Sequence, residues 1–171
     1  KYQKMQINRI YDIDRDKIIV MGAGFDKNIF YGPGKYRNDK DKIKIVYAGK
    51  LSHAKGVKFL VKAFNKLDDK RDENLKLKLV GEGNGKEFEE IKSLVKNSEA
   101  EIELPGSVPQ RKLGEIFRES DIFCLPSFYE GLALVVIEAL ASGLRIVTTD
   151  LPGLKEWLGD KINKSEVIEY V

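Results

Sequence analysis

One carboxylate in this sequence lies inside an apolar stretch of helical length. Glu138 is enclosed on both sides by apolar residues, within the run from Leu132 to Ala141. A helix that is apolar all round is normally buried, and an unpaired charge buried in it costs roughly several kcal/mol. Two interpretations follow. Either a neighbouring Arg or Lys neutralises Glu138, or its carboxylate faces a ligand cleft and accepts hydrogen bonds from hydroxyl groups.

The loop before this run has features of an anion site. Gly131 lies where the helix is expected to start, so a ligand can approach free backbone N–H groups that the helix dipole makes attractive to negative charge. Glu138 lies about two turns, or roughly 10 Å, further along the helix. A phosphate at the helix start and a ribose beside the second turn would therefore suit one nucleotide. Glu130 either supplies favourable charge near the helix N-terminus or bonds to sugar hydroxyls.

A second loop, Gly49–Gly56, follows an apolar run of strand length and is rich in glycine and lysine. Lys50 and Lys55 are bracketed by Gly49 and Gly56. Two lysines and flexible glycines at the carboxyl end of a strand can cradle a diphosphate. The alternative is a loop of solvated lysines.

The elements that would position these loops alternate between strand-like and helical patterns. Strand-length apolar runs occur at 18–21, 43–48, 75–80, 102–104, 122–125 and 146–149. Helical patterns occur at 57–67, 86–96, 113–118 and 132–141. This alternation is typical of an α/β fold, a Rossmann-like open parallel sheet with helices on both faces. In such sheets ligands bind beyond the carboxyl ends of the strands, where both loops lie.

Two further segments show little of the hydrophobic periodicity that marks strands and helices. Residues 22–42 are rich in Gly, Lys and Asp and poor in apolar residues, which predicts an irregular connector. The tail after Gly159 has only a weak helical pattern.

Composition narrows the class of protein. The 171 residues fit one domain with a proper core, and the net charge of +3 is not gathered into a basic face with interleaved aromatics, so nucleic acid is not an expected partner. No apolar run reaches the length needed to span a bilayer, so we expect a cytosolic protein, with attachment to the inner membrane surface compatible with this composition. The single cysteine, Cys124, excludes an internal disulfide, and the single histidine, His53, excludes a metal site built from several histidines.

The motifs taken together resemble a known family. They are Gly49-Lys50, Lys55-Gly56, Leu79–Gly83, Asp121, Leu125–Ser127, Glu130-Gly131, Glu138–Gly143 and Val147–Thr149. In this order and spacing the set is similar to the group 1 glycosyltransferases, family 4, of the GT-B fold. The resemblance runs from about Ile18 to Glu156 and implies that the chain is the carboxy-terminal, donor-binding half of such an enzyme.

The resemblance assigns roles to the residues that match the family's motifs. It implies that Glu130 contacts the donor sugar and that Glu138 contacts the ribose hydroxyls. Lys50 and Lys55, with Gly49, would bind the diphosphate. Further phosphate contacts would come from the backbone N–H groups of Gly131, Leu132, Ala133 and Leu134. The base would lie near the stretch from Gly81 to Gly83 and near Ser107 and Val108.

Two positions depart from the family's pattern. Lys50 stands where the family usually has Arg, which keeps the charge but loses the bidentate fork. Leu132-Ala133 replaces the usual Phe-Gly after Glu130-Gly131, so Ala133 adds a methyl group where a sugar or phosphate should come close. The Leu132-Ala133 departure favours, as an alternative, a non-catalytic nucleotide-sugar-binding module. A GT-B-like sugar-nucleotide epimerase is a second alternative, but it would need catalytic acids and a histidine that this stretch does not show.

The expected activity is transfer of a sugar from a nucleotide-diphosphate sugar to an acceptor hydroxyl, with retention of configuration. The nucleotide sugar is a substrate, and no cofactor is expected. Nor is a metal expected, because the Asp-X-Asp patterns at 12–14, 14–16 and 39–41 lie ahead of a strand and in the connector. We expect residues 1–16 to be the remnant of a connection from a missing amino-terminal acceptor domain, and residues 17–171 to bind the nucleotide sugar. The isolated domain is expected to be inactive.

Overall fold

The computed structural model describes residues 2–19, 24–32, 42–68, 75–163 and 168–170. Its centre is a sheet of parallel strands in the order β3-β2-β1-β4-β5-β6. The strands are β1 (Ile43–Ala48), β2 (Leu75–Val80), β3 (Ile102–Gly106), β4 (Ile122–Leu125), β5 (Arg145–Thr148) and β6 (Ile168–Tyr170). Every pairing in this sheet is parallel, which confirms the predicted open α/β sheet.

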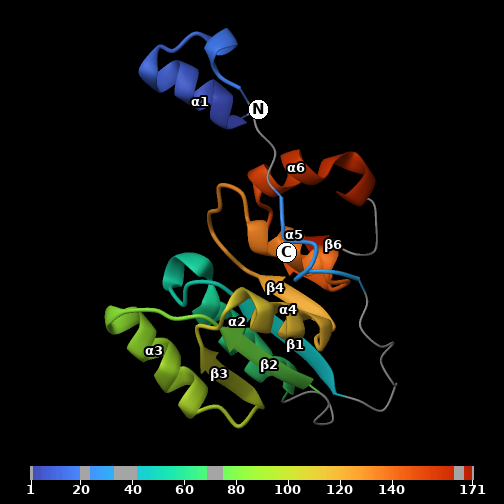
Figure 1. The fold of residues 1–171 in the computed structure, drawn as a ribbon. Helices are drawn as coiled ribbons and strands as arrows, with labels where there is room; N and C mark the ends of the chain where they lie inside the picture. The colour runs from blue at the N-terminus through green and yellow to red at the C-terminus, as the bar shows by residue number, and fades with distance from the viewer. Residues whose placement is uncertain (1, 20–23, 33–41, 69–74, 164–167, 171) are drawn as a thin grey trace.

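Helices cover both faces of the sheet. The helices in the described residues are α1 (Tyr2–Tyr11), α2 (Val57–Asp68), α3 (Gly85–Lys96), α4 (Gln110–Arg118), α5 (Leu134–Ala141) and α6 (Pro152–Asn163), with short 3₁₀ turns η1 (Arg15–Lys17) and η2 (His53–Lys55), and all but α1 lie against the sheet. Crossovers between parallel strands are right-handed, so the change of direction between β1 and β4 places α2 and α3 on one face and α4 and α5 on the other. Figure 1 shows α4 in front of the strands.

Leucine and lysine residues alternate along β2, so its two faces are stabilised in different ways. Leu75, Leu77 and Leu79 are buried in the core, whereas Lys76 and Lys78 point to the opposite face. Both lysines form ion pairs with Glu103 on β3, the edge strand beside them. Their aliphatic stems cover the sheet while their charges are paired, so this face is closed without apolar side chains at these positions.

The sheet brings its candidate loops to one crevice. The strand order reverses between β1 and β4, and ligands bind at such a switch point. Hydrogen bonding continues beyond the strand ends, because the amides of Gly49 and Leu51 donate to the carbonyls of Val80 and Glu82. The amide of Gly81 donates to the carbonyl of Gly106 in the same way. The loops after β1, β2 and β3 are therefore fixed to one another.

The elements differ from the sequence prediction at several boundaries. Helix α5 begins at Leu134 rather than Leu132, because the backbone of Ala133 (φ −77°, ψ 81°) is not helical. Helix α4 begins at Gln110, ahead of the predicted Leu113. Strand β6 was not predicted, since its three residues are too few to show a periodic pattern.

The predicted strand at 18–21 is wrong where the structure describes it. Ile18 and Ile19 lie in irregular backbone, and the Ile18 amide closes η1 by donating to the carbonyl of Arg15. Val20 and Met21 lie outside the described residues.

Part of the predicted irregular connector belongs to the core. Phe30 is almost fully buried, and its ring centroid lies 5.9 Å from that of Phe117 on α4. The Arg118 guanidinium donates to the carbonyl of Ile29 at 2.8 Å. The irregular backbone predicted for residues 22–42 is confirmed where the structure describes it, at 24–32, and one aromatic residue anchors this part in the core.

The proposed division at residues 1–16 stays a prediction. Figure 1 shows α1 apart from the sheet, beyond α6. Within the described parts of the chain, each helix is too short or too polar to cross a bilayer.

Candidate functional site

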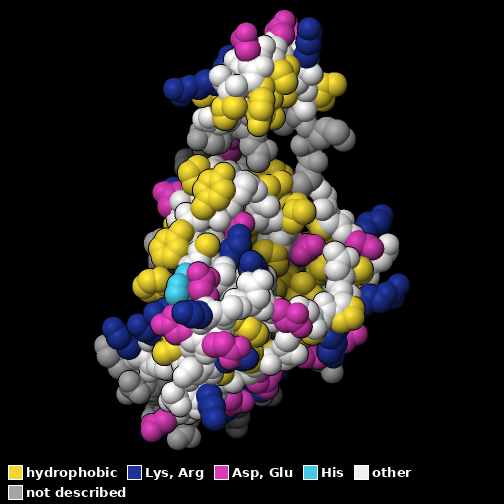
Figure 2. All heavy atoms as spheres, turned by 90° about the vertical axis from the view of Figure 1, so that its left-hand side faces the viewer, with side chains coloured by type: hydrophobic (Ala, Val, Ile, Leu, Met, Phe, Trp, Pro, Cys, Tyr) yellow, Lys and Arg dark blue, Asp and Glu magenta, His cyan; other side chains and the backbone are white. Residues whose placement is uncertain are grey.

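A cavity of about 550 Å³ opens at the carboxyl end of the sheet. Its lining comes from the ends of β1, β2 and β4, from the loops after β1 to β4, and from α4 and α5. The lining residues are Tyr47, Ala48, Gly49, Lys50, Lys55, Val80, Gly81, Glu82, Ser107, Val108, Leu113, Leu125, Glu130, Leu132, Ala133, Leu134, Val135 and Glu138. Figure 2 shows a hollow on this side of the molecule, with charged groups at its rim.

Most of the residues selected from the sequence line this one cavity. They include both lysines, both glutamates and the residues at the start of α5. Gly83 and Gly131 are the exceptions, and the structure gives each of them a packing role. A Cβ at Gly83 would lie 2.3 Å from the carbonyl oxygen of Leu51, and the carbonyl of Gly131 approaches Gly153 so closely that a Cβ there would lie 2.2 Å away.

Lys55 and Glu130 form an ion pair across the cavity. The Lys55 Nζ lies 2.7 Å from Glu130 Oε1, and both side chains are largely shielded from solvent. The same oxygen accepts a hydrogen bond of 2.9 Å from the hydroxyl of Ser127, which is fully buried. The sequence predicted a ligand contact for each charged residue, and it did not predict their contact with one another.

This ion pair depends on close approach of two loops. Gly56 adopts a left-handed conformation (φ +68°), and a Cβ there would lie 2.0 Å from the carbonyl oxygen of Pro126. The amide of Phe128 also donates to the carbonyl of Ala54 at 3.1 Å. Glycine at position 56 therefore lets the loop that holds Lys55 lie directly against the loop that holds Glu130.

The loop after β4 is also fixed on its other side. The hydroxyl of Thr149 donates to the carbonyl of Ser127, and the hydroxyl of Thr148 donates to the carbonyl of Leu125 at 3.0 Å. Both threonines lie at the end of β5. The Glu130 loop is thus held between the loop after β1 and the end of the neighbouring strand.

Tyr47 is a site residue that the sequence analysis missed. Its side chain is buried beneath the cavity, and its hydroxyl donates to the carbonyl of Lys50 at 2.8 Å. Burial raises the pKa of the Tyr47 phenol well above its usual range, and the charge of Glu130 adds to this effect. Tyr47 therefore stays protonated and supports the Lys50 loop from below. The signal in the sequence was an aromatic residue with a polar tip near the end of a buried strand.

We expect Tyr47→Phe to release the Lys50 loop without opening a cavity in the core. The lost hydrogen bond should lower the free energy of unfolding by about 1 kcal/mol. Affinity for a ligand that Lys50 contacts should fall several-fold. Thermal melting and ligand titration measure the two effects. Tyr11→Phe, on an exposed ring of α1, is the matched control and should change neither quantity.

Glu138 faces the cavity from α5. Its side chain is half-buried, and no Lys, Arg or His among the described residues forms an ion pair with it. Burial raises the pKa of the Glu138 carboxyl above its ordinary value. Of the two interpretations from the sequence, neutralisation by a neighbouring cation is therefore not observed in the described part of the chain.

Backbone groups at the start of α5 also line the cavity. The amide of Leu134 donates to the carbonyl of Leu132, and the amide of Val136 donates to the carbonyl of Ala133. No hydrogen bond is found from the amides of Ala133 and Val135 to other described residues. Because the helix dipole adds positive potential here, this end of α5 suits an anion.

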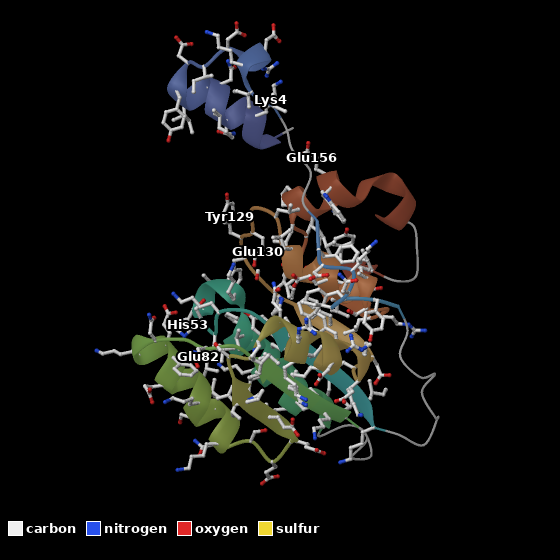
Figure 3. All side chains as sticks on the ribbon, viewed as in Figure 1. Lys4, His53, Glu82, Tyr129, Glu130 and Glu156 are labelled. Carbon is white, nitrogen blue, oxygen red and sulfur yellow. The ribbon has the colours of Figure 1, made fainter. Side chains whose placement is uncertain are left out.

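The end of the cavity near β2 and β3 has a different character. Val108 and Leu113 supply apolar surface, and Glu82 and Ser107 supply polar groups. Figure 3 shows Glu82 and Glu130 well separated, on different loops of the site. Leu113 was not selected from the sequence, because it does not stand out from its neighbours in type, whereas Glu82 belongs to the Gly81–Gly83 stretch that the resemblance places near the base.

The lone histidine and cysteine lie outside the cavity lining. His53 Nε2 lies 2.9 Å from Glu90 Oε2 on α3, which joins η2 to that helix. Cys124 is buried on β4, and burial raises the pKa of its thiol to about 12, so it is an inert core residue. Within the described residues no three His, Cys, Asp or Glu side chains are placed to hold a metal ion.

Comparison with known proteins gives a consistent result. Residues 33–169 match the family model for glycosyl transferases group 1. A curated D-inositol 3-phosphate glycosyltransferase from Pseudarthrobacter chlorophenolicus is 31% identical over 154 residues, which cover 84% of this chain and 36% of the relative. The chain spans less than half the length of the curated relatives it matches first.

Solved structures share the fold. The C-terminal domain of a group 1 family glycosyl transferase from Francisella tularensis superposes with a TM-score of 0.69 at 21% identity, covering 86% of this chain and 80% of that one. An Anabaena protein, determined in complex with UDP and glucose, gives a TM-score of 0.68 at 17% identity and covers 84% of this chain and 41% of that one.

Proposed function

Because the chain belongs to the group 1 glycosyltransferases, we propose that its cavity binds the nucleotide-diphosphate sugar from which such an enzyme takes its sugar. The observation that supports this proposal is that Lys50, Lys55, Glu130 and Glu138 line one cavity, next to the amides of Ala133 and Val135, which have no acceptor among the described residues. The Anabaena structure, which holds UDP and glucose, has the same fold. In the proposed reaction the sugar passes to an acceptor hydroxyl with retention of its configuration.

The order of the strands suggests how the donor lies. From β3 through β2 and β1 to β4, the lining changes from apolar and polar groups to cations and then to Glu130. We assign the base to the end lined by Gly81, Glu82, Ser107 and Val108, and the diphosphate to Lys50 and Lys55. The donor sugar then lies near Glu130, and the ribose hydroxyls donate to Glu138.

The proposed chemistry depends on charge that develops on the leaving group. When the bond between the sugar and the diphosphate breaks, the electron pair goes to the diphosphate oxygen. Lys50, Lys55 and the amides of Ala133 and Val135 are placed to stabilise that charge, which is the kind of electrostatic help that enzymes use for leaving groups. With the donor bound, the Lys55 ammonium group would interact with two anionic groups, the Glu130 carboxylate and the diphosphate. Binding of the donor therefore weakens the ion pair of the empty site.

The proposal assigns the acceptor to another part of the protein. The chain covers less than half the length of the curated relatives it matches first, and its cavity is open to the surface of the molecule. An amino-terminal domain across this opening would hold the acceptor and exclude water from the reacting sugar. The 171-residue chain alone should then bind nucleotide weakly and transfer no sugar.

The first test is calorimetric titration of the chain with UDP, GDP and ADP. We expect at least one of them to bind, and Lys55→Gln or Lys50→Gln to weaken its binding about tenfold, since a hydrogen bond to a charged group contributes about 1.5–3 kcal/mol. The corresponding nucleoside without phosphates should bind equally to all three proteins. Lys96→Gln, at an exposed position on α3, removes the same charge elsewhere and should leave the affinity unchanged.

A different outcome would favour the non-catalytic alternative. Ala133 is buried and lines the cavity, so its methyl group takes up space beside the start of α5. If none of the three diphosphates binds, and Ala133→Gly restores binding, this methyl group has closed the site. If none binds to either protein, the cavity is not a nucleotide site.

A further inference from the structure

The outer face of α2 combines positive charge with exposed apolar side chains. Lys58, Lys62 and Lys66 recur every fourth residue and form one row along the helix, and Phe59, Ala63 and Leu67 form a second row beside it. The last residue, Asp68, is the only acidic one in the helix. The opposite face of α2 holds the residues that reach the core, Val57, Leu60, Val61 and Phe64.

The large side chains of the apolar row are exposed to solvent. Phe59 is 55% exposed and Leu67 is 46% exposed. Phe59 meets Phe128 edge to face, with ring centroids 5.6 Å apart, and Phe128 is itself 66% exposed. Tyr129, the next residue, is 78% exposed. The contact between Phe59 and Phe128 thus joins α2 to the loop of Glu130, with Tyr129 next to Phe128 in the chain and Leu67 about two turns further along α2.

Two of the three lysines in the row are available to an outside partner. Lys58 pairs with Glu90 on α3, which closes that flank of the face. Lys62 and Lys66 are exposed, and neither forms an ion pair with another residue in the described ranges. Figure 2 shows hydrophobic side chains rising from beside the histidine along one flank of the molecule, with charged groups of both signs close to them.

We infer that this face, formed by Phe59, Lys62, Ala63, Lys66, Leu67, Phe128 and Tyr129, docks on an anionic lipid surface. Lysines attract anionic headgroups, and aromatic and leucine side chains enter the boundary between headgroups and acyl chains. A basic row next to an apolar row is the arrangement that such a surface needs. A typical protein surface carries charges of both signs, so it would complement a row of lysines less well than an anionic lipid surface does.

Docking through this face has a consequence for the cavity. Phe128 and Tyr129 directly precede Glu130, whose side chain lines the cavity. The mouth of the cavity would therefore lie beside the headgroups. The inference concerns where the chain sits and does not depend on which ligand the cavity takes.

The test measures co-sedimentation of the full-length gene product with vesicles. We expect binding to vesicles of phosphatidylcholine and phosphatidylglycerol in equal amounts, and little binding to phosphatidylcholine alone. Lys62→Gln with Lys66→Gln should lower the partition coefficient about tenfold to thirtyfold, because each lysine near an anionic surface contributes about 1 kcal/mol. Added salt should weaken the binding of the unchanged protein, since it screens the charges.

The matched control is Lys92→Gln with Lys96→Gln on α3, which removes the same charge at the same spacing from another helix. Phe59→Ser should weaken binding even at low salt, whereas Ile19→Ser, at a position that is 84% exposed, should not. Circular dichroism melting establishes that each variant is folded. Equal losses in the α2 and α3 variants would overturn the inference. An absence of binding to anionic vesicles would also overturn it. Binding by the 171-residue chain but not by the full-length product would overturn it too, because another part of the protein would then cover this face.

Discussion

Replacing Glu138 by alanine is expected to weaken binding of a nucleoside diphosphate by about one to two orders of magnitude, while the melting temperature stays the same or rises slightly. The carboxylate is half-buried and faces the cavity without a cation partner among the described residues. Burial of this carboxylate therefore lowers the free energy of unfolding, and hydrogen bonds from hydroxyl groups of a ligand would offset this loss. Titration calorimetry and thermal melting of the same preparation measure the two effects.

Glu138→Gln is the conservative companion to this variant. It keeps the shape of the side chain and one acceptor oxygen, so its affinity should fall between those of the unchanged protein and the alanine variant. A large drop in melting temperature with unchanged nucleotide affinity would mean that Glu138 has a structural role.

The same carboxylate predicts the direction of a pH effect. Its pKa is raised in the folded chain, so the stability that it contributes is present at low pH and is lost as pH rises through this raised pKa. Hydroxyl groups that donate to Glu138 favour its charged form, so nucleotide affinity should increase over the same pH range. Titrations at a series of pH values should show this increase for the unchanged protein and a smaller one for Glu138→Gln. The titration of the diphosphate itself is common to both proteins.

Gly56→Ala is expected to have the largest effect on folding stability of the changes discussed, a loss of about 3 kcal/mol or more. A left-handed conformation costs a residue with a side chain about 1–2 kcal/mol. In addition, the new Cβ would lie 2.0 Å from the carbonyl oxygen of Pro126, so one of the two loops must move. That movement separates Lys55 from Glu130, and diphosphate affinity should fall with stability. Denaturant unfolding gives the first quantity and calorimetry gives the second.

Gly85 provides a matched control for this substitution. Its φ of +65° is nearly the same as that of Gly56, but no atom lies within 4 Å of the position that a Cβ would take. Gly85→Ala should therefore show the conformational cost alone, about 1–2 kcal/mol, with normal nucleotide affinity. Equal losses for the two variants would contradict the role given to the contact with Pro126.

The strands of the fold were predictable because their residues are apolar in short, separated runs. The predicted bounds of 43–48, 75–80 and 122–125 agree with β1, β2 and β4. Glycine, proline, asparagine or a charged residue stands at each end of these runs, so their bounds were clear. At 18–21 the same kind of run was misleading, because hydrophobicity alone does not provide a neighbouring strand to pair with.

The sequence predicted which residues line the candidate site better than it predicted which of them contact one another. Parallel strands bring their carboxyl ends together, so loops that follow them must meet, and the lysines and glutamates of those loops meet in one cavity. The ion pair between Lys55 and Glu130 joins residues 75 positions apart, and no local pattern marks it. Tyr47 was missed for a related reason, since its importance lies in the carbonyl that its hydroxyl reaches.

The loops around the cavity touch one another through main-chain atoms. Gly81 packs on the carbonyl of Gly49, Gly56 on that of Pro126, and Gly153 on that of Gly131. Main-chain contacts of this kind are independent of the side chains that point inward. Evolution or an engineer can therefore exchange the inward-facing residues to suit another ligand while the shape of the rim is inherited unchanged.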